Sequence, residues 1–237
     1  MASTATLHTT STHSDKPLTG GTSTQVICGD SRLILPQLPP ADLLLADPPF
    51  DQWTDFIPLI ASRKDGTIAC FTSWQHRIPI ETAMGKPKAE IIWHFPDGRW
   101  VSHQLPRITH SSILIYGKTY DAFVGEPVDD MTPQNKGRGS VGKDKLGERI
   151  YEPRERKMLN SVIIAPRNVH RGLWSKPDAV LRPIIEWLSP EGGTVIDAFM
   201  GAGNSLRLAH ALGRSSIGID IDPDACRETE LRTQPMF

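Results

Sequence analysis

The segment that most constrains the fold is an apolar run, residues 41–46 (ADLLLA), which stops abruptly at Asp47-Pro48-Pro49-Phe50. A short apolar run with a sharp polar end is typical of a strand buried on both faces, as in a parallel sheet. The two prolines fix φ and remove two backbone donors, so the loop that follows the strand is stiff. Open α/β sheets bind ligands at the carboxyl ends of such strands, so this loop is a candidate site.

Similar runs recur along the chain and alternate with helix signals. Including residues 41–46, the strands we expect cover residues 25–28, 41–46, 67–71, 90–93, 112–116, 194–196 and 216–219. Helices are expected at residues 55–62, 176–188 and 205–212, with Pro177 in a first turn and Gly213 as a stop. This alternation predicts an α/β fold, a doubly wound and mostly parallel seven-stranded sheet.

Composition excludes several classes of protein. Apolar residues make up 38% of the 237 residues, which is enough for a folded core. No apolar run approaches the ~18 residues that span a bilayer, so no membrane is expected. The cysteines, Cys28, Cys70 and Cys226, form no CxxC pair. We therefore expect no zinc ribbon, no other metal and no disulfide framework, and we expect a cytoplasmic protein.

The net charge of −1 means that a nucleic-acid binder of this sequence would need its basic residues gathered in one place. Such a segment exists, since residues 125–157 are polar, rich in Gly and Pro, and without helical or strand periodicity. Its basic residues are Lys136, Arg138, Lys143, Lys145, Arg149, Arg154, Arg156 and Lys157. Four acidic residues accompany these eight, an excess of four positive charges. A solvated charged loop would also explain this pattern, but the segment is where contacts to phosphates are predicted.

A second candidate site is the turn from Asp197 to Asn204, which follows an expected strand. Gly201 and Gly203 would let a ligand approach the backbone, and the next helix would offer free N–H groups. Asp220 ends the following strand, where a carboxylate can accept both hydroxyls of a ribose. A Gly-x-Gly-x-x-Gly dinucleotide motif is incomplete here, because its sixth position is Leu206. The pattern favours an adenosyl cofactor over a nicotinamide cofactor, and a purely structural turn is the alternative.

The loop at Asp47 suits chemistry on an amino group. A carboxylate and the Pro48 carbonyl could accept both hydrogens of one amino group and turn the nitrogen lone pair towards an electrophile. Phe50 offers a face on which an extruded base could stack. The alternative is that Pro48 and Pro49 merely end a strand and that Phe50 belongs to the core.

Together, the two motifs resemble those of the amino-group DNA methyltransferases. The catalytic signature of that family, [Asp/Asn/Ser]-Pro-Pro-[Tyr/Phe/Trp], stands at residues 47–50, and its cofactor signature, Asp-x-Phe-x-Gly-x-Gly, stands at residues 197–203. The catalytic motif comes first, which is the circularly permuted order of the β group of these enzymes. The resemblance covers roughly residues 25–225.

The resemblance implies transfer of a methyl group from S-adenosyl-L-methionine to a flipped-out base of double-stranded DNA, without a covalent enzyme–base intermediate. It implies catalytic roles for Asp47, Pro48, Pro49 and Phe50. It implies cofactor contacts from Asp30, Lys176, Pro177, Asp197, Phe199, Gly201, Gly203, Asn204 and Asp220. Trp93 and His110 match weaker family positions. Asp at position 47 favours adenine N6 over cytosine N4 as the target.

The expected organisation has four parts. These are a flexible tail (1–24), the catalytic part of a Rossmann-like methyltransferase domain (25–123), a small target-recognition insertion (124–165) and the cofactor-binding part (166–237). A homodimer is compatible with this organisation. The alternatives are a cytosine-N4 enzyme, an RNA or protein methyltransferase, a non-catalytic DNA-binding regulator and a nicotinamide oxidoreductase. The permuted motif order counts against RNA and protein acceptors, and an intact Asp47 counts against a regulator.

Overall fold

The computed structural model describes residues 21–99, 102–120, 122–124, 140–143, 149–151, 157–170 and 173–233. Most of the expected tail, residues 1–20, lies outside the described residues. Ordered structure was expected from residue 25, and the first strand begins at Thr24.

An eight-stranded sheet forms the centre of the molecule. Its order is β1-β14-β13-β2-β3-β5-β4-β10, and its strands are β1 (Thr24–Cys28), β2 (Leu43–Ala46), β3 (Thr67–Thr72), β4 (Ala89–Arg99), β5 (Ile108–Tyr116), β10 (Val162–Ile164), β13 (Thr194–Asp197) and β14 (Ser215–Asp220). All neighbouring pairs are parallel except those of β5, which runs against β3 and β4. The mostly parallel α/β sheet expected from the sequence is therefore confirmed.

The sheet has eight strands, one more than the seven expected from the sequence. The additional strand is β10, which pairs with the edge strand β4 over three residues. Such a short edge strand carries no clear alternation of its own, and it lies within the segment assigned to the insertion.

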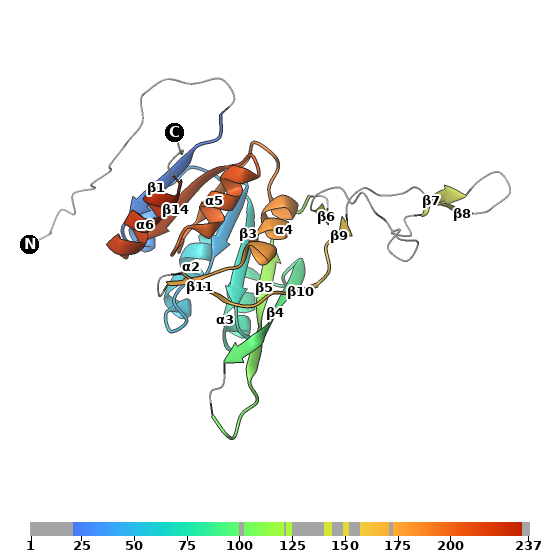
Figure 1. Ribbon diagram of the computed structural model, residues 1–237, viewed down its shortest axis with the longest axis horizontal. Helices are drawn as coiled ribbons and strands as arrows, with labels where there is room; N and C mark the ends of the chain where they lie inside the picture. The colour runs from blue at the N-terminus through green and yellow to red at the C-terminus, as the bar shows by residue number, and fades with distance from the viewer. Residues whose placement is uncertain are drawn as a thin grey trace, which may run out of the picture.

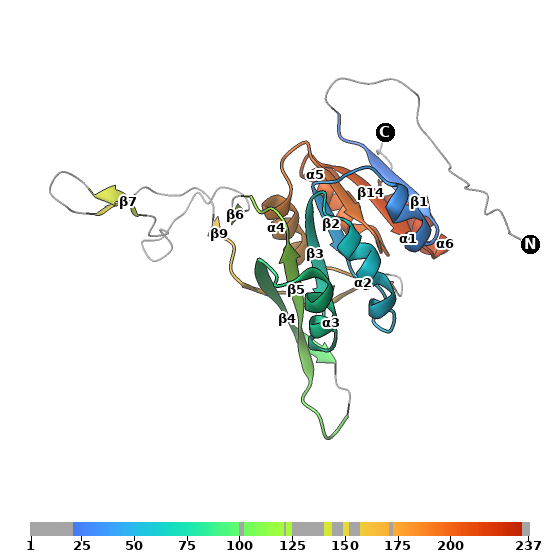
Figure 2. The same ribbon diagram turned by 180° about the vertical axis from the view of Figure 1, so that it is seen from behind.

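Helices cover both faces of the sheet. Figure 1 shows α4 (Asp178–Leu188), α5 (Asn204–Ala211) and α6 (Pro223–Thr233) on one side. Figure 2 shows α1 (Ser31–Ile34), α2 (Trp53–Ser62) and α3 (Trp74–Met84) on the other; a 3₁₀ turn, η1 (Leu35–Gln37), follows α1. Because side chains alternate along a strand, each face has its own apolar cluster. Leu43 and Leu45 belong to one cluster, and Leu44 and Ala46 belong to the other.

The helices differ from expectation in several places, since α1, α3 and α6 were not among those expected from the sequence. The structure contains α3, which had no clear helical signal, and Ile80 is its one buried residue. A helix that buries so little shows hardly any apolar periodicity in its sequence. Pro177 was expected inside a first helical turn, but it is the residue just before α4, with an extended ψ of 148°. Helix α4 therefore begins at Asp178.

Short strand pairs occupy the described parts of the insertion, where no strand periodicity was expected. The strand β6 (Phe123–Val124) pairs with β9 (Lys157–Met158), and β7 (Ser140–Lys143) pairs with β8 (Arg149–Tyr151). A further antiparallel pair, β11 (Asn168–His170) and β12 (Leu173–Ser175), leads into α4. The boundaries assigned to the insertion remain a prediction.

Helix α6 packs directly on the turn that precedes α5. At Gly203 the backbone is left-handed, with φ of 70°, and an added Cβ would lie 2.3 Å from Cγ2 of the buried Thr229 on α6. Glycine is therefore required here by the fold itself, independently of any ligand.

We expect Gly203→Ala to lower the free energy of unfolding by about 2–4 kcal/mol, because the methyl group overpacks Thr229 and the left-handed backbone disfavours alanine. Gly192→Ala is the matched control. It shares a positive φ of 77°, but its added Cβ would meet no atom within 4 Å. The control should lose only about 1 kcal/mol in the same urea titration. Equal losses would contradict the packing argument.

Candidate active site

The two sequence motifs meet because their strands are neighbours in the sheet. The strand β13 runs parallel to β2 with Asp197 opposite Leu45. The backbone N–H of Ala198 also donates to the Leu45 carbonyl at 3.2 Å. Both strands end at the same edge, so Asp47 and the turn after Asp197 begin side by side.

The loop at residues 47–50 presents its polar and aromatic groups outward. The Asp47 side chain is 42% exposed, Pro48 is buried, and Phe50 is 58% exposed. The exposure of Phe50 excludes a core position for it. Its ring stands edge-on to the ring of His76, with 4.7 Å between centroids, and partial burial lowers the pKa of His76. Phe50 therefore packs against His76 and remains exposed to solvent.

The carboxylate of Asp197 stabilises the glycine turn through hydrogen bonds. It accepts the backbone N–H of Phe199 at 3.0 Å and the hydroxyl of Ser205. The turn then passes through Gly201 and Gly203, both with positive φ. Burial raises the pKa of Asp197 to about 6, against the opposing effect of these hydrogen bonds.

Asp220 and Asp30 lie together at the neighbouring strand ends. The carboxylate of Asp220 accepts the N–H of Gly201 at 2.8 Å and that of Asp222 at 2.9 Å. The N–H of Gly29 donates to the Asp220 carbonyl at 2.8 Å, which brings Asp30 to the same edge. Hydrogen bonds from the Arg32 guanidinium, the shortest at 2.6 Å, hold the pKa of Asp30 below its usual value. Sequence reasoning did not identify Arg32.

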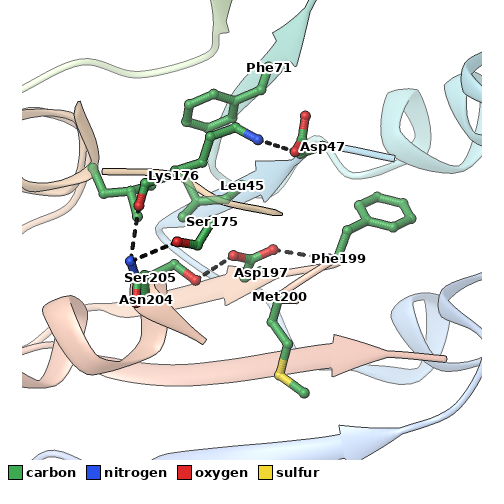
Figure 3. A pocket seen from close by; sticks show the side chains of 11 residues that line it. Leu45, Asp47, Phe71, Ser175, Lys176, Asp197, Phe199, Met200, Asn204 and Ser205 are labelled. Atoms are coloured by element: carbon green, nitrogen blue, oxygen red, sulfur yellow. Dashed lines mark hydrogen bonds and ion pairs between the residues drawn. The ribbon is translucent and has the colours of Figure 1, made fainter. Parts of the chain in front are cut away.

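A pocket opens between the loop and the turn, and residues of both motifs line it (Figure 3). Five of the residues predicted for the site line this pocket, namely Asp47, Lys176, Asp197, Phe199 and Asn204. The other predicted catalytic and cofactor residues lie outside its lining, namely Asp30, Pro48, Pro49, Phe50, Pro177, Gly201, Gly203 and Asp220. Asp30 and Asp220 lie at the ends of the adjacent strands β1 and β14.

Sequence reasoning missed six lining residues, Leu45, Phe71, Ser175, Leu181, Met200 and Ser205. Phe71 lies near the end of β3, which neighbours β2, so knowledge of the strand order would have identified it. Of the two weaker family matches, Trp93 is buried and donates to the Ala165 carbonyl at 2.9 Å. His110 is exposed and stands opposite His94.

The basic insertion follows β5, whose carboxyl end lies beside the start of β3. It is therefore attached at the end of the sheet opposite the Asp47 loop and the glycine turn. The N–H of Tyr120, just before β6, donates to the carbonyl of Trp187 in the last turn of α4, whereas α4 begins beside Lys176. Of the predicted DNA-binding residues, Lys143, Arg149 and Lys157 lie in β7, β8 and β9. The others, Lys136, Arg138, Lys145, Arg154 and Arg156, lie outside the described residues. DNA binding by this segment stays a prediction.

Within the ranges given above, no cluster of three or more His, Cys, Asp or Glu side chains could hold a metal ion. In the same part of the chain, none of the helices is both long enough and apolar enough to cross a membrane.

The raised pKa of Asp197 predicts a pH dependence of stability. Because the folded pKa of about 6 lies above the ordinary 3.8, the folded protein binds this proton more tightly than the unfolded chain does. The contribution of Asp197 to the free energy of unfolding should therefore rise as the pH falls through 6, and this gain should be complete near pH 3.8. Between about pH 7 and pH 4, wild type should gain up to about 3 kcal/mol relative to Asp197→Asn, which cannot titrate there. Chemical denaturation across this range measures the difference, and a constant difference would contradict the prediction.

Comparisons with known proteins identify the family of the chain. A model of the N6/N4 DNA methylase family matches residues 62–231, which include the glycine turn and begin after the Asp47 loop. The type II methyltransferase M.ScaI of Streptomyces caespitosus is 35% identical over 65 residues, which are 26% of this chain. The chain matches only about a fifth (21%) of that protein's length.

Solved structures of the same fold cover nearly the whole chain. The M1.HpyAVI–SAM complex has a TM-score of 0.60 at 17% identity, covering 89% of this chain and 100% of that one. The cytosine-N4-specific PvuII DNA methyltransferase has a TM-score of 0.65 at 13% identity, covering 91% and 88%. TTHA0409 of Thermus thermophilus, a putative DNA modification methylase complexed with S-adenosyl-L-methionine, has a TM-score of 0.57 at 15% identity, covering 88% and 92%.

These structures establish a Rossmann-like methyltransferase fold. The family match spans well over half of the chain, and the methyl donor used in this family is S-adenosylmethionine. The protein therefore belongs to the N6/N4 DNA methylase family.

Proposed function

We propose that this protein transfers a methyl group from S-adenosylmethionine to an exocyclic amino group in double-stranded DNA, with adenine N6 as the acceptor. The observation that carries the proposal is the shared pocket, in which Asp47 of the catalytic loop and Asp197 and Asn204 of the glycine turn line one cavity. Family membership supports the same reaction.

The residues at the strand ends fit an adenosyl ligand. Each oxygen of Asp220 accepts one backbone N–H and keeps a second lone pair, so the carboxylate can still accept both hydroxyls of a ribose. Asp30 lies just beyond the end of the neighbouring strand and is the proposed contact of the adenine. Asp197, already engaged with Phe199 and Ser205, holds the turn against which the methionine end would rest.

The bound cofactor supplies a methyl group activated by a positively charged sulfonium. The protein's task is then to position the acceptor nitrogen and to accept its hydrogens. Asp47 and the Pro48 carbonyl are the proposed acceptors, and the exposed face of Phe50 is the proposed support for the flipped base. As the new N–C bond forms and the S–C bond breaks, the nitrogen gives up one proton, and Asp47 is the proposed acceptor of that proton.

The choice of adenine rests on Asp47, the residue type that favours N6 targets in this family. Cytosine N4 presents the same kind of amino group on a six-membered ring, so the same loop could act on either base. Methylated plasmid DNA digested to nucleosides should contain N6-methyl-2′-deoxyadenosine. N4-methyl-2′-deoxycytidine instead would overturn the choice of base and leave the reaction class intact.

The role of Asp47 can be tested with a tritiated methyl donor and duplex DNA. Asp47→Ala should lower methyl transfer by about 10²–10⁴-fold, because the amino group loses its principal acceptor. Asp51→Ala is the matched control, since Asp51 is exposed and follows the same loop. The control should retain nearly full activity. Wild-type-like activity in Asp47→Ala would reject the proposal, as would a preference of the wild-type enzyme for RNA or protein acceptors.

The insertion can be tested through Lys143 and Arg149, which are paired across β7 and β8. The double charge reversal Lys143→Glu/Arg149→Glu should weaken DNA binding and reduce its salt dependence by about two phosphate contacts, because both residues are predicted to contact DNA phosphates. Cofactor affinity should not change. A second double variant, Lys64→Glu/Arg227→Glu, makes the same change in net charge at exposed positions elsewhere. Equal weakening by both variants in a fluorescence titration would show only a general charge effect.

A further inference from the structure

Lys176 touches both motifs of the site. Its backbone carbonyl accepts the side-chain N–H of Asn204, the first residue of α5, at 3.1 Å. Its ammonium group forms an ion pair with the carboxylate of Asp47 in the catalytic loop. Figure 3 shows both contacts. One residue therefore ties the glycine turn, through its main chain, to the catalytic carboxylate, through its side chain.

Two aromatic rings restrict the position of the Lys176 side chain independently of its ion pair with Asp47. Its Nζ lies 5.2 Å from the centroid of the Phe71 ring and 5.9 Å from that of Trp93. Both aromatic residues are buried, and the lysine side chain is only 23% exposed. Exposed ion pairs gain little because two flexible side chains must be ordered, but here one partner is already held by the two rings.

Asp47 has no such support of its own. Its side chain is 42% exposed at the start of a loop, and its one described ion pair is with Lys176. A carboxylate that must accept one hydrogen of a neutral amino group while the Pro48 carbonyl accepts the other has to keep one orientation, and a displacement of about 1 Å can cost about 100-fold in rate. The pair with Lys176 supplies that orientation.

We propose that Lys176 is a positioning residue, which orients the Asp47 carboxylate for methyl transfer and contributes little to cofactor affinity. The inference rests on the proposed function and changes the role expected from the sequence, where Lys176 was assigned to the cofactor. The two roles predict different kinetics. A cofactor contact acts on the affinity for S-adenosylmethionine, and a positioning contact acts on kcat.

The test compares Lys176→Met and Lys176→Arg with wild type. We expect Lys176→Met to lower kcat by about 10–100-fold while the Kd of S-adenosylmethionine stays within about threefold. Lys176→Arg should recover most of the lost kcat, because a guanidinium can also stack on Phe71 and pair with Asp47. A large loss of cofactor affinity with kcat retained would overturn the inference.

Lys118→Met is the matched control. The Lys118 ammonium also lies over an aromatic ring, that of Tyr120 at 4.7 Å, but at the opposite edge of the sheet. Its kcat should equal that of wild type. An equal fall of kcat in Lys118→Met and Lys176→Met would assign the effect to stability and reject positioning.

A double-mutant cycle separates the inference from the proposed function. Once Asp47→Asn has removed the carboxylate, adding Lys176→Met should lower kcat no further, and additive losses would overturn the inference. Absence of methyl transfer by wild type to any DNA would instead reject the proposed function. In that case the ion pair can still be tested by measuring Tm for wild type, the two single variants and the double variant. Additive changes in Tm would show that the two side chains do not interact.

Discussion

The parallel pairing of β13 with β2 is the constraint on which the site depends. It sets Asp197 opposite Leu45 and so places the ends of two strands, far apart in the sequence, at one edge of the sheet. Both strands are almost fully buried, so their pairing is held by the apolar clusters on the two faces as well as by hydrogen bonds. The catalytic loop and the glycine turn are adjacent because of this register.

Two residues of the glycine turn build the fold as well as the site. A glycine is required at position 203 because Thr229 of α6 packs against it. The carboxylate of Asp197 already accepts hydrogen bonds within its own turn. A motif that is typical of a ligand site is therefore partly a packing motif. The groups that remain open for chemistry are fewer, chiefly Asp47, Phe50 and the free lone pairs of Asp220.

The charged groups around the pocket form one connected set. Asp47, Lys176 and Asp197 influence one another, since the negative charge of Asp47 raises the pKa of the buried Asp197 and the positive charge of Lys176 lowers it. Asn204 links this set to α6, because its side-chain oxygen accepts the Arg232 guanidinium at 2.6 Å. The catalytic loop, the cofactor turn and the last helix thus share one network of polar contacts, which makes their geometry mutually dependent.

The sequence by itself determined the strand-helix alternation, the two motifs and the family, because buried strands and glycine turns leave strong local patterns such as residues 41–46 and 197–203. It could not reveal α1, α3, α6 or β10, because these elements are short or bury few large apolar side chains and so leave no clear pattern. Only the tertiary structure decided that Lys176 pairs with Asp47 and that Phe71 lines the pocket. It also decided that the basic insertion is attached at the strand ends opposite those that carry the site. These facts depend on strand order and register, which no local pattern encodes.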